Sequence, residues 1–156
     1  MKRRAILAFM LDRPGVLSKV SMLIRKKMYN VDTLTVCSSR VPGISRMTIT
    51  LREDDIAKVT QVIKQLEKFT EVISAKELDT NKSYWREAAI VKLEIDSDHL
   101  KTYQDRFNFE MLEKKNRDIQ IIQVAGSTAQ IDTFLDEIGR ENIIEIARTG
   151  VAAMEK

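Results

Sequence analysis

Hydrophobic and polar positions in the first half of the chain predict the order strand, helix, strand, strand, helix, strand. Residues 5–11 form a continuous apolar run, which is typical of a strand buried on both faces. Apolar residues then recur at helical spacing from Val16 to Met28, and Pro14 suits the first turn of this helix. The remaining elements that we expect are strands over 31–37 and 44–51 joined as a hairpin, a helix with Asp54 as its N-cap, and a strand over 71–75.

The second half repeats this order after a polar stretch that begins at Asp79. The expected elements are a strand over 88–95, a short helix from Ser97, a strand over 107–112, a hairpin loop over 113–117, a strand over 119–124, a helix with a Ser127–Gln130 capping box, and a strand over 143–146. Met111 and Leu112 could instead extend the helix, but the loop that follows them favours a strand. Each half therefore predicts the βαββαβ order of ferredoxin-like domains. The predicted fold class is α+β, with one domain over 1–78, a linker over 79–85 and a second domain over 86–156.

Composition narrows the class of protein. The 156 residues are 44% hydrophobic and 31% charged, values of an ordinary globular chain rather than a disordered one. Lys and Arg number 26 against 23 Asp and Glu, and the net charge of +3 is too small to imply a nucleic-acid or membrane partner. The apolar stretches are shorter than a membrane span, and the single cysteine favours a reducing compartment. We therefore expect a cytoplasmic protein.

Catalytic and metal-binding motifs are missing from the sequence. The single histidine, His99, lies at a predicted helix start, where we expect a solvated residue. Cys37 alternates with Val and Thr residues in a predicted strand and is expected to be a buried small hydrophobe. The strand over 44–51 contains no aromatic residue, which disfavours RNA binding. We therefore expect a chain that is not an enzyme and binds no metal.

The junction over 12–17 is the one candidate binding element. Gly15, Val16 and Leu17 would present backbone N–H groups at a helix N-terminus, where a small carboxylate can bind, and Gly15 would let that group approach the backbone. Asn30 carries a donor and an acceptor, which suits a zwitterion. The alternatives, a tight turn that binds nothing and an ordinary turn asparagine, stay open on the residues alone.

Several segments together form the pattern of a known family. They are Leu11–Val20, Tyr29–Val36 (Tyr-Asn-Val-Asp-Thr-Leu-Thr-Val), Ser45–Ile49 (Ser-Arg-Met-Thr-Ile), Arg86–Glu87 with Lys92, and Glu145–Gly150. With these segments the chain resembles the acetolactate synthase (acetohydroxyacid synthase) small subunit with its ACT domain. The resemblance covers essentially the whole chain and is strongest over residues 3–52. Two departures stand out: Asp12 occupies a position where the family often has Asn, and the strand over 107–112 lacks the usual Ile-Val-Asp-Val character.

The resemblance implies a regulatory subunit that pairs with a separate catalytic subunit carrying thiamine diphosphate, Mg²⁺ and FAD, with no cofactor on this chain. It also implies activation of that subunit and feedback inhibition by valine or another branched-chain amino acid. The effector would lie between the ACT domains of a homodimer, bound by residues from both chains. They are Asp12, Pro14, Gly15, Val16 and Leu17 of one chain and Asn30 and Val31 of the other. The alternatives are a free-standing ACT-type amino-acid sensor with a different partner and an RNA-binding protein with two ferredoxin-like domains.

Overall fold

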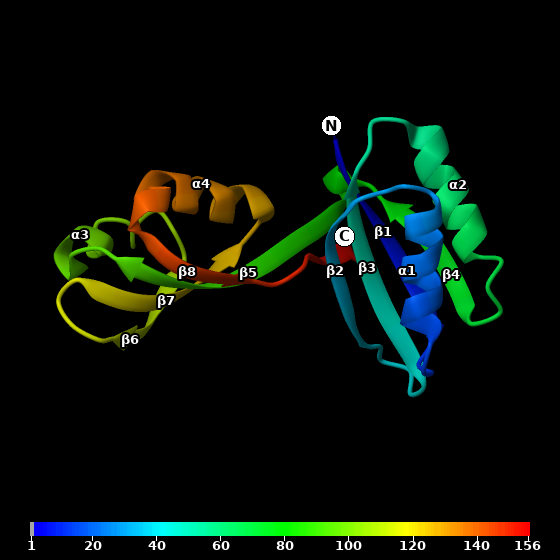
Figure 1. Cartoon of the computed structure of the whole chain (residues 1–156), viewed down its shortest axis with the longest axis horizontal. Coiled ribbons are helices and arrows are strands. Elements are labelled where there is room, and N and C mark those ends of the chain that lie inside the picture. Colours follow the sequence, from blue (N-terminus) through cyan, green and yellow to red (C-terminus); the bar gives the residue numbers. More distant parts are fainter. Residues whose placement is uncertain (1) are drawn as a thin grey trace. The chain divides into compact units, whose positions relative to one another are not determined.

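Four strands and two helices form the main body of the first of two compact units in the computed structural model, which describes residues 2–156. These elements are β1 (Arg3–Leu11), α1 (Val16–Lys26), β2 (Val31–Ser38), β3 (Ile44–Arg52), α2 (Ile56–Leu66) and β4 (Val72–Leu78). The strands make one antiparallel sheet in the order β2-β3-β1-β4 (Figure 1). Since consecutive strand residues alternate between faces, one face of the sheet can bury the apolar sides of both helices.

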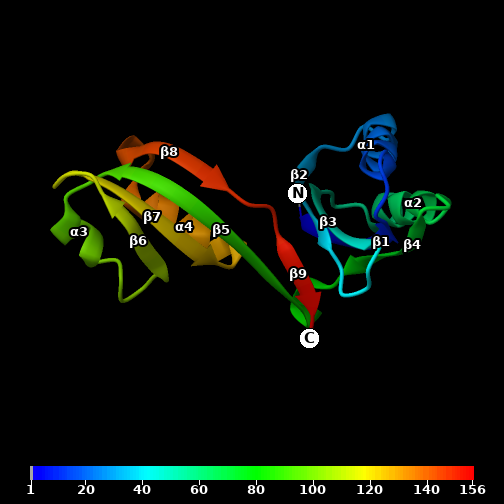
Figure 2. The same ribbon diagram turned by 90° about the horizontal axis from the view of Figure 1, so that it is seen from below.

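The strand β1 lies at the centre of this unit and is buried on both faces, as predicted. Ile6, Ala8 and Met10 belong to the core that the two helices cover. Ala5 and Leu7, which point to the other face, are 0% and 4% exposed. The C-terminal strand β9 (Ala152–Glu155) covers that other face and belongs to the same compact unit (Figure 2).

The second compact unit, Trp85–Gly150, repeats the same order of elements. Its elements are β5 (Ser83–Glu94, which begins in the first unit), α3 (Ser97–Lys101), β6 (Phe109–Lys114), β7 (Ile119–Gly126), α4 (Thr128–Ile138) and β8 (Ile143–Arg148), with short 3₁₀ turns η1 (Thr80–Lys82) before β5 and η2 (Arg140–Asn142) before β8. The strands are ordered β6-β7-β5-β8, and β9 pairs with β5 off this path. The two-domain ferredoxin-like fold class is therefore confirmed.

A cluster of aromatic side chains packs within the largely aliphatic core of the second unit. Phe134 of α4 is 0% exposed, and its ring centroid lies 5.1 Å from that of Phe107 and 6.3 Å from that of Tyr103, edge to face with both. Ser127 and Gln130 form the predicted capping box at the start of α4. This cap orients the helix that carries Phe134 into the core.

Two predictions about helix starts are wrong. The N-cap of α2 is Asp55 rather than Asp54, because the Asp55 carboxylate accepts a 2.8 Å hydrogen bond from the Ala57 amide. Pro14 lies in the turn before α1 rather than in its first turn, and Gly15 is the N-cap. Helical periodicity does not decide which of two adjacent residues is the N-cap. The choice is between two neighbouring aspartates for α2, and between a proline and the glycine after it for α1.

Strand bounds differ from expectation at several places. The strand β5 begins at Ser83 rather than at residue 88, and β6 runs over Phe109–Lys114, which shortens the expected hairpin loop. The strand β9 was not predicted at all. In the structure, Val151–Lys156 belong to the first unit, whereas the predicted second domain extended to residue 156.

Candidate effector site and family membership

The turn from β1 into α1 is open and has no side-chain cap. Gly15 adopts a left-handed backbone conformation with φ +86°, and no side chain makes a capping hydrogen bond there. Apart from Gly15 and its two chain neighbours, no atom of the described residues lies within 4 Å of where a Cβ on Gly15 would stand. Asp12 and Pro14 are exposed, Leu17 is 45% exposed, and Val16 is buried beneath the turn. The turn can therefore admit a ligand carboxylate to the helix N-terminus.

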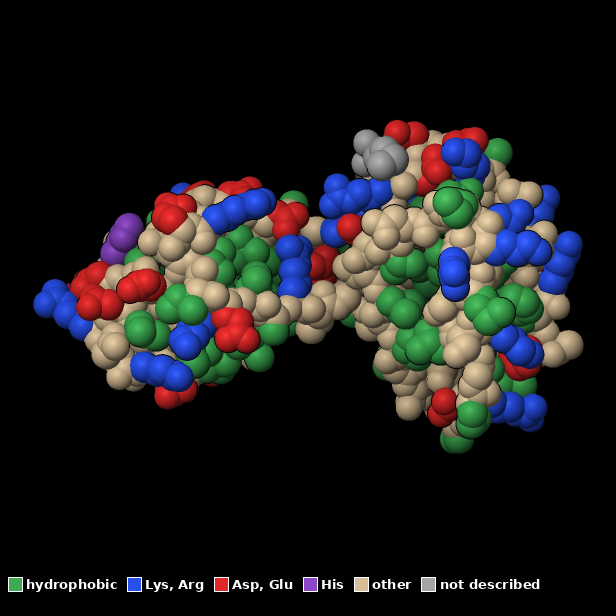
Figure 3. Space-filling model, in the orientation of Figure 1, with side chains coloured by type: hydrophobic (Ala, Val, Ile, Leu, Met, Phe, Trp, Pro, Cys, Tyr) green, Lys and Arg blue, Asp and Glu red, His purple; other side chains and the backbone are tan. Residues whose placement is uncertain are grey.

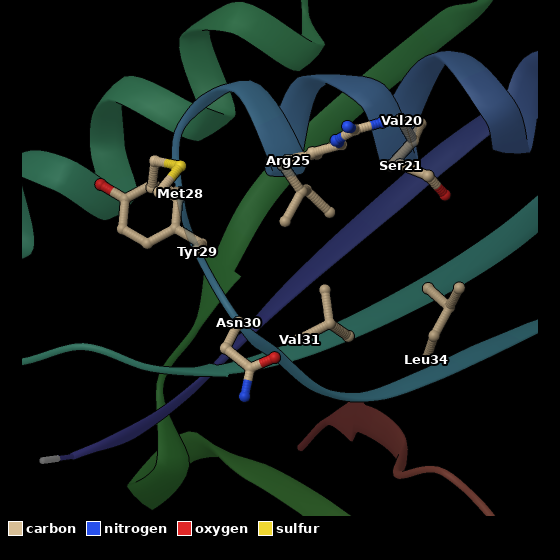
Figure 4. A pocket seen from close by; sticks show the side chains of 9 residues that line it. Val20, Ser21, Arg25, Met28, Tyr29, Asn30, Val31 and Leu34 are labelled. Carbon is tan, nitrogen blue, oxygen red and sulfur yellow. The ribbon is translucent and has the colours of Figure 1, made fainter.

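Asn30 and Val31 lie beyond the other end of α1, beside a cavity of about 410 Å³ between α1 and β2. Val31 and Leu34 point toward the helix, whereas the Asn30 amide is turned away from it (Figure 4). Tyr29 also lines the cavity, and burial raises the pKa of its phenol. None of the residues from Asp12 to Leu17 lines this cavity. Half of the predicted site therefore borders a mainly apolar hollow.

A single chain does not bring the two halves of the predicted site together. The turn containing Gly15 precedes α1 and Asn30 follows it, and a helix of 11 residues is about 16 Å long. A ligand the size of an amino acid cannot span that distance. If both halves bind one ligand, they must come from different chains.

The strand β2 is an edge strand with apolar side chains near the cavity. Leu34 and Val36 are 39% and 44% exposed, and Met22 on α1 is 67% exposed. Hydrophobic side chains gather between α1 and β2 on this face of the unit (Figure 3). An unpaired strand edge beside exposed apolar groups is a surface that a second chain can cover.

Two arginines hold the start of strand β2. Asp32 forms ion pairs with Arg3 of β1 and Arg52 of β3, beside a shift in strand register between Val31 and Thr33. Burial acts to raise the pKa of Asp32, but the hydrogen bonds and charges of the two arginines hold that pKa below its usual value. Irregularities of this kind redirect neighbouring side chains. The ion pairs of Asp32 therefore help to fix the direction in which the chain passes from Asn30 into β2. Asp32 lies inside the segment Tyr29–Val36, but no pattern in the sequence indicates the role of its carboxylate.

The equivalent turn of the second unit, between β5 and α3, is filled by the protein's own carboxylate. Asp96 accepts hydrogen bonds of 2.8 Å and 3.4 Å from the Asp98 and His99 amides and pairs with Arg117 at 2.9 Å. The hydrogen bond from the Asp98 amide holds the pKa of Asp96 below its usual value, and the hydrogen bond from Arg117 adds a smaller effect in the same direction. This helix start is therefore closed to a ligand carboxylate.

The two residues weighed for catalysis are both at the surface. His99 is exposed on α3 with its ring 5.7 Å from that of Tyr103, as the prediction of a solvated residue required. Cys37 is exposed, so the prediction of burial is wrong: it belongs to an edge strand. Within residues 2–156, no group of three His, Cys, Asp or Glu could hold a metal ion. No helix in the described part is long and apolar enough to span a membrane.

Comparison with known proteins identifies the family. The probable acetolactate synthase small subunit of Methanothermobacter thermautotrophicus is 34% identical over 155 residues, which cover 97% of this chain and 91% of that protein. This chain belongs to the acetolactate synthase small-subunit family. The acetolactate synthase isozyme 3 small subunit of Escherichia coli is 30% identical and covers 99% of this chain, with 96% of that protein matched.

Family models divide this sequence in two. The model described as "AHAS small subunit-like ACT domain" matches residues 6–74, and "Small subunit of acetolactate synthase" matches residues 86–156. The crystal structure of the Thermotoga maritima acetolactate synthase small subunit superposes with a TM-score of 0.87 at 28% identity, covering 100% of this chain and 98% of that one. The first unit is therefore an ACT domain, and the predicted family is confirmed.

Proposed function

We propose that this protein is the regulatory subunit of an acetolactate synthase in valine, leucine and isoleucine biosynthesis. In this proposal it is not catalytic, it activates a large subunit that carries thiamine diphosphate, Mg²⁺ and FAD, and it makes that subunit inhibitable by valine or another branched-chain amino acid. Membership of the small-subunit family supports the pairing with a large subunit. The domains in this proposal are 1–78 and 86–156, joined by 79–85, with the last six residues of the second domain packing on the first unit.

The effector site in this proposal spans two ACT domains of a homodimer. The observation that carries it is the open turn at Gly15, where a helix N-terminus has no side-chain cap. The ligand carboxylate would bind the Gly15–Leu17 amides of one chain, with Asp12 and Pro14 beside it, and the ammonium group would bind the Asn30 side chain of the other. The apolar hollow next to Val31 suits a branched aliphatic side chain. The edge position of β2 supports pairing with a second copy.

Calorimetry of the full chain tests the effector. We expect valine, leucine or isoleucine to bind with a stoichiometry of one ligand per chain. Analytical ultracentrifugation should show that the protein is a dimer. Aspartate, whose second carboxylate would meet the apolar hollow, is the control and should not bind. If none of the three branched amino acids binds, the proposed site is wrong.

Reconstitution tests the partner. Mixed with the large subunit encoded by the same organism, the chain should raise acetolactate formation, and the effector should then inhibit it. The isolated chain should form no acetolactate from pyruvate. Effector binding without any association with the large subunit would instead support the free-standing sensor, and acetolactate formation that scales with the isolated chain would contradict the regulatory role.

A further inference from the structure

The C-terminal strand β9 packs on the face of the ACT sheet that the helices leave uncovered (Figure 2). Val151, just before this strand, is 0% exposed, and Ala153 within it is 5% exposed. Ala5 and Leu7, on that face of β1, are buried as well. The chain reaches this position directly after leaving the second unit at Gly150. The segment that follows the second unit directly in sequence is therefore part of the buried interior of the first unit.

Polar contacts attach this segment to strands across the sheet. The Val151 amide donates a 3.3 Å hydrogen bond to the Thr33 hydroxyl of β2. The Arg46 guanidinium on β3 donates to the Ala153 carbonyl and lies over the Phe9 ring at 5.4 Å. On β4, the Lys76 ammonium lies 2.5 Å from the Glu155 carboxylate. Three strands are thus joined to the segment by side chains.

The attachment at Thr33 lies next to the proposed effector site. Thr33 follows Val31 by two positions, across the register shift, and its hydroxyl also shares a 2.6 Å hydrogen bond with Thr50. A hydroxyl with one proton that bonds to both Thr50 and the Val151 amide is fixed in orientation. Any displacement of β2 at Val31 therefore changes the geometry of the Val151 contact.

We propose that Val151–Lys156 is a strap that positions β2 for the effector and carries the occupancy of the effector site to the point where the chain leaves the second unit. Thr33 and Arg46 are its positioning residues, and neither is assigned to contact the effector. This inference rests on the proposed function. By reciprocity of coupled equilibria, a strap that strengthens effector binding must itself be held more tightly when the effector is bound.

Hydrogen exchange and calorimetry on the full chain test the strap, with valine as the probe. In the wild-type protein, saturating valine should slow exchange of the Val151–Lys156 amides by about fivefold, the factor that corresponds to one neutral hydrogen bond. Thr33→Val, which removes the hydroxyl and keeps the shape, should weaken valine binding by about fivefold and speed exchange in the strap. Thr35→Val is the matched control. Its hydroxyl lies on the same strand and face and is buried without a partner in the described structure, so neither readout should change.

A second variant separates the strap from a local effect on β2. Arg46→Met removes the donor to the Ala153 carbonyl but leaves the side chains of β2 unchanged. Weaker valine binding together with faster strap exchange in this variant is the result expected if the strap carries the effect. Faster strap exchange with unchanged valine affinity in both Thr33→Val and Arg46→Met would show a purely structural segment and overturn the inference. Valine that binds but leaves strap exchange unaltered would overturn it equally. Failure of the wild-type protein to bind any branched-chain amino acid is a different result, since it removes the proposed function itself.

Discussion

The two units of this protein share one order of elements but build the turn into their first helix in opposite ways. In the ACT domain, Gly15 takes a left-handed conformation and leaves the start of α1 without a side-chain cap. In the second unit, Asp96 caps α3 with its own carboxylate and is held by Arg117. A carboxylate position is thus open in one unit and occupied in the other. The fold provides a helix N-terminus in both, and the turn residues decide whether a ligand can use it.

The outer faces of the two sheets differ as well. In the ACT domain the strap covers this face, and Leu7 on the central strand is 4% exposed. In the second unit, Ile90 lies on the central strand β5 and is 49% exposed. An apolar sheet face contributes to stability only when another element buries it. The C-terminal segment therefore stabilises the sheet of the ACT domain and not that of the second unit. The comparison indicates that each unit has its own core, and the first prediction tests this.

Phe134→Ala should have the largest effect, a loss of about 3–5 kcal/mol of stability confined to the second unit. The reason is that Phe134 is fully buried and contacts the Phe107 and Tyr103 rings. Calorimetric unfolding with and without valine should show the valine-sensitive transition at its original temperature and the other one lowered. Ile49→Ala in the ACT core is the matched change and should lower the valine-sensitive transition instead. Equal shifts of both transitions in either variant would mean that the units unfold as one.

Gly15→Asp would give the ACT domain the internal carboxylate that the second unit has at Asp96. A like charge facing the ligand carboxylate costs several kcal/mol, so valine binding should weaken by more than about a hundredfold. Gly15→Asn is the matched control, because Asn and Asp both tolerate the left-handed conformation and have the same shape. Titration of both variants, each checked for folding by circular dichroism, decides the point. Comparable losses in the two variants would assign the effect to the backbone and not to charge.

The order of elements in both units could be predicted because periodicity in the apolar positions is a local property. A turn at Gly15 between the first strand and the first helix could be predicted for the same reason, since proline followed by glycine after a strand is itself a local signal. That a ligand binds at this turn stays a prediction. The capping box at Ser127 and Gln130 was likewise visible in four consecutive residues. These features depend on neighbours in sequence, and the structure confirms them.

The strap and the exposure of Cys37 could not be predicted because both depend on residues far apart in the chain. The strand β9 is short, and the partners of its segment, Thr33 and Arg46, lie more than a hundred positions earlier. Cys37 has the residue pattern of a buried strand, and only the position of β2 at the edge of the sheet exposes it. Strand order within a sheet is a tertiary property that alternation along one strand does not contain.

Asp12→Asn should produce a smaller change in the same turn. An aspartate beside the ligand carboxylate repels it, and Asn removes the charge, so effector binding should tighten by about 1 kcal/mol if Asp12 contacts the ligand. Asp12 is not the N-cap of α1, because Gly15 holds that position, so the change should leave helix stability unaltered. Titrations of valine against both proteins at one ionic strength measure the difference. Weaker binding by the Asn variant would contradict the placement of Asp12 beside the ligand carboxylate.

Met28→Gly should have the smallest effect and the opposite sign, a gain in stability of about 0.5–1 kcal/mol. The chain leaves α1 through Met28 at φ 59°, a conformation that is unfavourable for a side chain, whereas it leaves α4 through Gly139 at φ 87°. Met28 is 91% exposed, so little packing is lost when its side chain is removed. Lys27→Gly is the control: Lys27 has φ −88°, and glycine there only adds freedom to the unfolded chain, which should lower stability. Urea unfolding of the two variants compares them directly, and a less stable Met28→Gly protein would contradict the prediction.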